Sequence, residues 1–263
     1  MDGEIAFEGV SFRYEDGDKE VFSGLDLSLP LGIVSLVGQN GTGKSTLLLL
    51  ASGRIMPTSG RVLIRGRDTR ELGDEQERQS IVSFIYQNME FESEEPIGEL
   101  LQYVYQNGLL HPAEPNLIAE LVEVFELAPV LGRRTHEVSK GELQRAILAF
   151  SLLYGSPLIA MDEPIFALEE RQKLAAMTCL TRRAKARGTG LYYSVHELDI
   201  SRTFSDYLLL FSRDAQPRQG TTEEMFTREI IEKAYEVPFD MLKRREELYR
   251  SYLVELLRVR GKK

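Results

Sequence analysis

The sequence is poor in cysteine and in long apolar runs. Its one cysteine, Cys179, allows no disulfide within the chain, which suits a reducing compartment. A membrane-spanning helix needs ~18 apolar residues in a row, whereas one of the longest runs, AILAFSLLY at 146–154, is far shorter and includes a serine. The first residues, MDGEIAFEGV, have neither the basic start nor the apolar centre of a signal peptide. We therefore expect a cytoplasmic chain, and contact with a membrane protein stays open.

Positive charge is also in short supply. The chain has 32 lysines and arginines against 41 aspartates and glutamates, a formal net charge of −9. This balance argues against a broad nucleic-acid surface, which needs cations to release the counterions of the phosphates. With 43% hydrophobic and 28% charged residues, the composition is that of a soluble globular protein without repeats or low-complexity segments.

Runs of β-forming or apolar residues alternate with helical sequence, which predicts an α/β fold. Six runs carry this prediction: 4–14, 26–37, 61–65, 81–86, 157–162 and 190–195. The last three are apolar throughout, as parallel strands buried on both faces are. Helical sequence separates each of them from the next, so we expect βα units that bind ligands at the carboxyl ends of the strands.

Two further segments read as helical. We expect a helical subdomain at 96–154, inserted into an α/β core formed by 1–95 and 155–225, and a C-terminal helical extension at 226–263.

The stretch GQNGTGKST at 38–46 matches the phosphate-loop pattern, with an apolar strand before it and helix-forming residues after it. Glycines let the backbone N–H groups turn inward toward phosphate oxygens at a helix start. Lys44 is expected to reach the β- and γ-phosphates and Ser45 to ligate Mg²⁺. The nucleotide-binding residues predicted here are Gly38, Gln39, Asn40, Gly41, Thr42, Gly43, Lys44, Ser45 and Thr46.

A pair of carboxylates, Asp162 and Glu163, leaves the apolar strand of SPLIAMDEP. One can enter the Mg²⁺ shell while its neighbour polarises an attacking water. With the phosphate loop present, this pair indicates a nucleoside triphosphate hydrolase.

Four further stretches, in this order, resemble those of the ATP-binding-cassette (ABC) ATPases over residues 4 to about 225: SFRYEDG, FIYQN, VSKGELQR and YYSVHELD. By this resemblance Tyr14 stacks on adenine, and Gln87 joins the Mg²⁺ and water shell. His196 contacts the γ-phosphate. The family signature falls on Ser139, Gly141 and Glu142, and it closes over the ATP of a second cassette.

The resemblance implies a P-loop NTPase (RecA-like) core with an antiparallel β subdomain and an inserted α-helical subdomain. It also implies ATP and Mg²⁺ as cofactors, Glu163, His196, Lys44 and Gln87 as catalytic residues, and Ser45, Gln87 and Asp162 as metal ligands. Two cassettes, expected to be identical, sandwich two ATP molecules head to tail. SKGE itself also reads as a helix N-cap with an acidic first turn.

Two sites depart from the family pattern. Lys140 replaces the first glycine of the signature, and this either strains a backbone that needs positive φ or strengthens the γ-phosphate clamp. In EPIFALEE, Phe166 and Glu169 replace a small hydroxyl residue and an aspartate in the loop that couples the two sites. The hydrolytic groups are intact, so we expect ATPase activity.

The resemblance favours the ATPase subunit of an importer, peripheral on the inner face of the membrane. Its partners would be polytopic permease subunits and, indirectly, a solute-binding protein; no nucleic acid is expected. The segment 220–240 resembles cassettes for iron–siderophore, haem and cobalamin uptake. Zinc or manganese import, a soluble cassette of iron–sulfur cluster assembly, and a degenerate nucleotide-gated adaptor are the alternatives.

Overall fold

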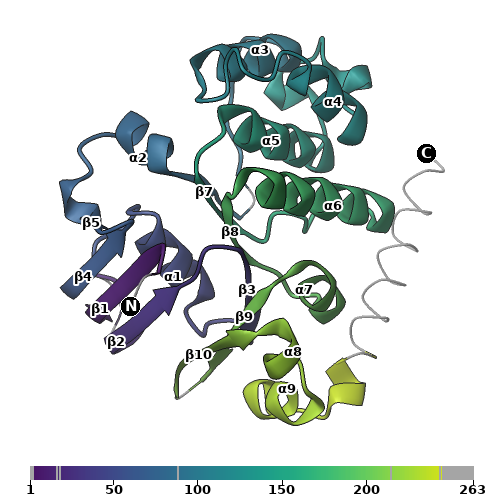
Figure 1. Cartoon of the computed structure of the whole chain (residues 1–263). Coiled ribbons are helices and arrows are strands. Elements are labelled where there is room, and N and C mark those ends of the chain that lie inside the picture. The colour runs from purple at the N-terminus through teal and green to yellow at the C-terminus, as the bar shows by residue number, and fades with distance from the viewer. Residues whose placement is uncertain are drawn as a thin grey trace.

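The computed structural model describes residues 3–15, 17, 19–87, 89–213, 215–242 and 244, and its strands form two sheets (Figure 1). The smaller sheet is antiparallel, with the order β2-β1-β4-β5. Its strands are β1 (Ile5–Phe12), β2 (Phe22–Leu29), β4 (Ser59–Ile64) and β5 (Arg67–Asp68). This sheet is the antiparallel β part that the resemblance implied.

The larger sheet has the order β10-β9-β3-β8-β7-β6, and all its neighbours are parallel except β9 and β10. Its strands are β3 (Ile33–Gly38), β6 (Val82–Ile85), β7 (Leu158–Asp162), β8 (Gly190–Ser194), β9 (Tyr207–Ser212) and β10 (Ala215–Thr221). Because β3, β6, β7 and β8 run in parallel, their carboxyl ends meet at one edge of the sheet.

One expectation about the strands was wrong. The run at 26–37 is not one element, because the chain leaves β2 at Leu29 and enters β3, in the other sheet, only at Ile33. Pro30 lies in this break, and proline has no N–H to donate to a ladder. The strand expected within 81–86 is confirmed as β6, which covers 82–85 after helix α2 ends at Ile81. Strands β5, β9 and β10 were not foreseen.

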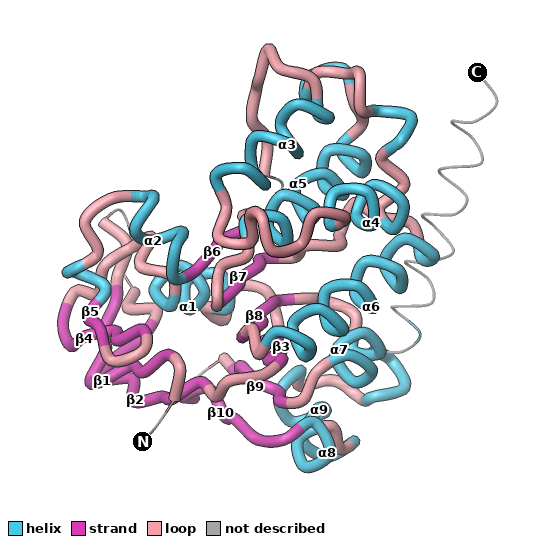
Figure 2. Tube along the Cα trace, turned by 45° about the horizontal axis from the view of Figure 1, so that its top comes forward, coloured by secondary structure: helices cyan, strands magenta, loops and turns pink. Residues whose placement is uncertain are grey.

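The α-helices in the described part of the chain are α1 (Lys44–Ala51), α2 (Glu75–Ile81), α3 (Ile97–Asn107), α4 (Leu117–Val124), α5 (Lys140–Tyr154), α6 (Glu170–Arg187), α7 (Leu198–Phe204), α8 (Thr222–Met225) and α9 (Arg228–Tyr235). Short 3-10 turns lie at Thr69–Glu71, Ala128–Val130 and Thr135–Glu137. Figure 2 shows α3, α4 and α5 gathered at one end of the larger sheet and α8 and α9 at the other.

Apolar side chains fill three clusters. One joins the smaller sheet and α1 to one face of the larger sheet through residues such as Leu47 and Leu36. A second continues from the opposite face of the larger sheet into α3–α6, so the helices at 97–154 share their core with the sheet. A third holds α8 and α9 against β9.

The expected division into domains stays a prediction. The helices α3, α4 and α5 do fall within 96–154. Much of the expected extension at 226–263 lies outside the described residues.

Candidate functional site

The phosphate loop, residues 38–46, connects the buried strand β3 to helix α1 as expected. Gly38, Gly41 and Gly43 have φ values of +150°, +76° and +100°. At Gly38 a Cβ would also lie 2.5 Å from the carbonyl oxygen of Phe211 on the neighbouring strand β9. Only glycine fits that approach, so the first glycine is required for packing as well as for its φ angle.

Lys44 is held inside this loop. Its Nζ donates to the carbonyl oxygens of Gly38 at 2.9 Å and Gln39 at 2.8 Å, and the residue is only 7% exposed. Burial lowers the pKa of Lys44, while the negative charges of Glu163 and Asp162 oppose that shift. Both carboxylates are therefore close enough to act on the loop lysine.

The other loop residues fall into two groups. Asn40, Gly41 and Ser45 are exposed, whereas Gln39, Thr42 and Gly43 are half-buried and Thr46 is buried. The Thr42 hydroxyl donates to the Gln39 carbonyl at 2.8 Å, which braces the loop from within. The exposed Ser45 hydroxyl, in the first turn of α1, is free to reach a metal ion.

Tyr14 lies beside the phosphate loop. Its hydroxyl is 3.0 Å from Oγ1 of Thr46, and its ring meets the ring of Phe12 edge-on with centroids 4.8 Å apart. The residue remains 45% exposed. An accessible aromatic ring thus stands next to the loop, and its stacking on adenine stays a prediction.

Asp162 is the last residue of β7 and Glu163 follows it; both are held by Ser194, at the end of the adjacent strand β8. The Ser194 hydroxyl donates to Oδ1 of Asp162 and accepts from the backbone N–H of Glu163 at 3.0 Å. Asp162 is buried, whereas Glu163 is half-buried and has a left-handed φ of +49°. Sequence reasoning missed Ser194; a hydroxyl in the buried strand GLYYS was its only signal.

His196 and Glu163 are in direct contact. Nε2 of His196 lies 2.6 Å from Oε1 of Glu163, and the histidine side chain is 41% exposed. Two predicted catalytic residues from the ends of neighbouring parallel strands therefore meet. Gln87, just beyond the end of β6, is exposed at the same edge of the sheet.

Ser139 caps helix α5. Its hydroxyl accepts from the N–H of Glu142 at 3.3 Å, and Oε2 of Glu142 accepts from the N–H of Ser139 at 2.7 Å. The hydrogen bonds from the Ser139 N–H and hydroxyl hold the pKa of Glu142 below its usual range. The predicted N-cap is confirmed.

Lys140 is the first helical residue of α5 and is not among the described residues with positive φ. The backbone cost considered for a side chain at this position therefore does not arise. Its Nζ forms an ion pair with Oε1 of Glu90 at 2.9 Å, and both side chains are largely exposed. The Lys140 ammonium is therefore exposed to solvent at the N-terminus of α5, where it pairs with Glu90.

Gly141 touches the loop that follows the catalytic carboxylates. A Cβ at this glycine would lie 2.9 Å from the carbonyl oxygen of Ala167. Gln144, one turn further along α5, accepts from the N–H of Ala167 at 2.9 Å and donates to the carbonyl of Glu163 at 3.3 Å. Gln144 was also missed, because its role depends on where the loop at 163–168 returns to α5.

The predicted site residues Lys44, Asp162, Glu163 and His196 lie together at the carboxyl edge of the larger sheet, and the signature residues form a separate group at the start of α5. Within the described residues, the side-chain hydrogen bonds and ion pairs of Ser139, Lys140 and Glu142 run to one another and to Glu90, and none runs to the phosphate loop.

The predicted metal ligands are chemically suitable for Mg²⁺, which takes oxygen ligands and retains several waters. Asp162 offers a buried carboxylate with only Oδ1 bonded to Ser194, and Ser45 offers an exposed hydroxyl. The amide oxygen of Gln87 completes the set. The donors fit the ion, and their roles as ligands stay a prediction.

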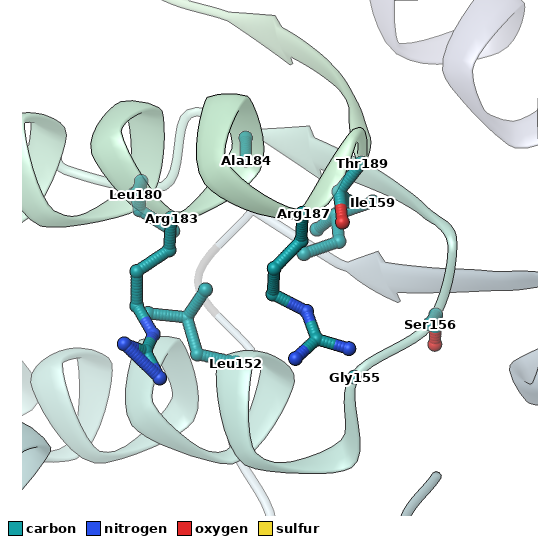
Figure 3. A pocket seen from close by; sticks show the side chains of 9 residues that line it. All are labelled: Leu152, Gly155, Ser156, Ile159, Leu180, Arg183, Ala184, Arg187 and Thr189. Carbon is teal, nitrogen blue, oxygen red and sulfur yellow. The ribbon is translucent and has the colours of Figure 1, made fainter. Parts of the chain in front are cut away.

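A small pocket between α5 and α6 is not a second site (Figure 3). Its volume is about 10 Å³, enough for one water molecule at most. The guanidinium groups of Arg183 and Arg187 in its wall both pair with Glu114. Arg183 also pairs with Glu120, so each guanidinium already has a carboxylate partner and the pocket belongs to the packing of the helices.

A phosphate loop, a carboxylate pair and a histidine at the carboxyl edge of a parallel sheet define a nucleoside triphosphatase. The chain belongs to the ABC transporter family, whose model, described as "ABC transporter", matches residues 22–166. It is an ABC-type ATPase that uses ATP and Mg²⁺.

Curated relatives cover most of the chain. The nickel import ATP-binding protein NikO of Rhodobacter capsulatus is 32% identical, with 86% of this chain and 93% of the relative covered. The manganese transport system ATP-binding protein MntA of Synechocystis sp. is 29% identical, with 88% and 90% covered. The iron(3+)-hydroxamate import ATP-binding protein FhuC of Bacillus subtilis is 26% identical, with 86% of each chain covered.

Among solved structures, the chain is similar to the dimeric post-hydrolysis state of the ATP-binding cassette MJ0796 bound to ADP and Pi. The TM-score is 0.71 at 21% identity, with 83% of this chain and 98% of that chain covered. This likeness confirms the predicted fold class. Within the residues that the structure describes, no helix combines the length and apolarity that crossing a bilayer requires.

Proposed function

We propose that the chain is the ATP-hydrolysing subunit of an importer, working as a head-to-tail pair of cassettes on the inner face of a membrane. One observation carries the proposal. Glu163 and His196 of one chain meet at the carboxyl edge of the larger sheet. Helix α5, which carries the signature residues, begins at the exposed Ser139, and among the described residues Ser139 bonds to none of the phosphate loop. A second cassette placed head to tail would supply that serine to the bound nucleotide.

The chemistry follows from the positions of the side chains. Backbone N–H groups of the loop and Nζ of Lys44 neutralise the phosphates, and the carboxylate of Glu163 orients the attacking water. His196 contacts Glu163 directly, which supports the proposed role of His196 beside the γ-phosphate. Bound Mg²⁺ would supply charge neutralisation on the leaving side.

A groove of about 560 Å³ next to Gln87 supports docking of a membrane subunit. Its walls come from 85–86, from 89–92, from the segment 135–147 and from Ala167, and they include exposed or half-buried apolar side chains such as Tyr86, Met89 and Phe91. An apolar groove with a polar rim suits an amphipathic helix. Helix α3 contributes none of the described lining residues.

The cargo proposed here is a transition metal or a metal chelate. The relatives named above are a manganese, a nickel and an iron-hydroxamate system. The narrower choice of an iron chelate, haem or cobalamin rests on residues 220–240 alone. In such systems a solute-binding protein would deliver the cargo to the permease.

Co-purification of the full chain from detergent extracts tests this function. A polytopic membrane subunit in the complex, with ATPase activity that Glu163→Gln abolishes, is the expected result. Soluble scaffold proteins in its place would favour the iron–sulfur assembly alternative. An assembled complex with no ATPase activity would refute the proposal that the cassette is active.

The dimer has its own test. Glu163→Gln should retain MgATP and form a stable dimer in size-exclusion chromatography, because ATP stays between the two cassettes. A variant that remains monomeric with saturating MgATP, alone and in the assembled complex, would overturn the head-to-tail arrangement.

A further inference from the structure

Two hydrogen bonds join the end of helix α9 to the start of the phosphate loop. The backbone N–H of Gly38 donates to the hydroxyl of Tyr235 at 3.1 Å. The side-chain Nε2 of Gln39 donates to the backbone carbonyl of Tyr235 at 2.6 Å. Nearly two hundred residues separate the partners, so this contact depends entirely on the packing of the C-terminal segment.

The packing beneath this contact is firm. Ile231 and Ala234 of α9 are buried against Leu208 and Leu210 of β9, in a cluster that also includes Val37, the neighbour of Gly38. The helix then ends at Glu236, which has a left-handed φ of +56°. Tyr235 is therefore fixed relative to the strand from which the phosphate loop emerges.

The same two loop residues also hold Lys44. Its Nζ donates to the carbonyl oxygens of Gly38 and Gln39, at 2.9 and 2.8 Å. The Gln39 carbonyl accepts from the Thr42 hydroxyl as well. Tyr235 thus bonds to the two residues on which the position of the phosphate-binding lysine depends.

We propose that Tyr235 is a positioning residue of the phosphate loop: it fixes Gly38 and Gln39 from outside, so that Lys44 is in place before MgATP arrives. Without the hydroxyl, the Gly38 N–H loses this partner and the start of the loop samples more conformations. Ordering the loop then costs part of the binding free energy. The affinity for MgATP falls, whereas the Glu163–His196 pair, which Tyr235 does not contact, stays unchanged.

Tyr235→Phe isolates the effect, because it removes only the hydroxyl and leaves the ring and the backbone carbonyl. The Kd for MgATP is measured by calorimetry on the full chain with Glu163→Gln, so that no turnover occurs. One neutral hydrogen bond changes an equilibrium by roughly 2- to 13-fold, so we expect the Kd to rise about threefold or more, and the Tm is measured in parallel.

Tyr192→Phe is the matched control. It also removes one tyrosine hydroxyl bond, to the carbonyl of Pro30 at 3.0 Å, and should leave the Kd unchanged. Hydrogen exchange of peptides covering 33–43 in the nucleotide-free chain provides a second readout. The Gly38 amide should exchange faster in Tyr235→Phe than in the parent chain and the control.

Three outcomes would overturn the proposal. The first is an unchanged Kd in Tyr235→Phe, and the second is an equal rise in both variants. The third is an unchanged rate of hydrogen exchange in the peptides covering 33–43 of Tyr235→Phe. This result would overturn the proposal even if the variant chain were less stable overall. None of these outcomes bears on whether the chain partners a permease, which the co-purification tests separately.

Discussion

Replacing Gly141 by alanine tests how the signature helix and the catalytic carboxylates are connected. The added Cβ would lie 2.9 Å from the carbonyl oxygen of Ala167, whereas ordinary contacts begin at 3.4 Å. Because that neighbour is backbone, helix and loop must separate by about half an ångström. The loop does not move alone, since Gln144 joins the N–H of Ala167 to the carbonyl of Glu163.

Two opposing terms set the stability of Gly141→Ala. Alanine gains at most ~1 kcal/mol over glycine in a helix, and overpacking costs ~1–3 kcal/mol. The net destabilisation is therefore ~0–3 kcal/mol, and we expect the chain to stay folded. Activity is more sensitive, because a misplacement of ~1 Å at a catalytic group can cost ~10²-fold. For half that displacement at Glu163 we expect kcat to fall about tenfold.

The assay is phosphate release by the assembled complex at saturating MgATP, with Tm measured alongside. Gly132→Ala is the control, because nothing lies within 4 Å of a Cβ there and Gly132 has no positive φ. Wild-type kcat in Gly141→Ala would refute the inference that this contact sets the loop. An equal loss in Gly132→Ala would do the same.

Three further predictions concern single groups. Glu90→Gln removes the carboxylate partner of Lys140, an exposed ion pair worth ~0–1 kcal/mol, so the Tm should stay constant. Combined with Glu163→Gln, it should lower the MgATP concentration at which dimers form in low salt. Weaker dimerisation would argue against a role of Lys140 in clamping the γ-phosphate. The buried Cys179 thiol, whose pKa is raised by burial, should react with a thiol reagent such as DTNB only as the chain unfolds, and fast labelling of the native chain would contradict this placement. The depressed pKa of Glu142 stabilises the folded chain above the ordinary glutamate pKa of ~4.3, and this contribution is lost as the pH falls through the folded-state pKa. Wild type should therefore lose more unfolding free energy than Glu142→Gln between pH 5 and 3. Identical losses would rule out a capping contribution.

The predictable part of the site rests on local patterns. The phosphate loop is contiguous, with its strand, glycines and helix in one stretch, so Gly38–Thr46 could be placed from sequence. Residues at the ends of parallel strands meet because the sheet has one carboxyl edge, and this brings Glu163 and His196 together. The capping pattern at Ser139 and Glu142 also predicted the start of α5 to within one residue.

The unpredicted part depends on contacts distant in sequence. Ser194, Gln144 and Tyr235 are ordinary residues in their own segments, and each gains its role only where another element packs against it. The break after β2 was missed because the apolar pattern continues across Pro30, although the strands on either side belong to different sheets. The spacing of apolar residues shows which residues are buried, but it does not show which strands pair with each other.

The loop that carries the departures Phe166 and Glu169 is held by backbone hydrogen bonds. Backbone bonds close the loop after Glu163: the N–H of Phe166 donates to the Glu163 carbonyl at 3.3 Å, and that of Leu168 to the Ile165 carbonyl at 3.1 Å. Glu169 serves as the N-cap residue of α6. None of these bonds uses the side chain of Phe166, which is 45% exposed. The hydrolytic groups are held independently of the Phe166 side chain. Phe166→Ser should therefore leave the nucleotide affinity of a single cassette unchanged and alter only the interaction between the two cassettes of the proposed dimer.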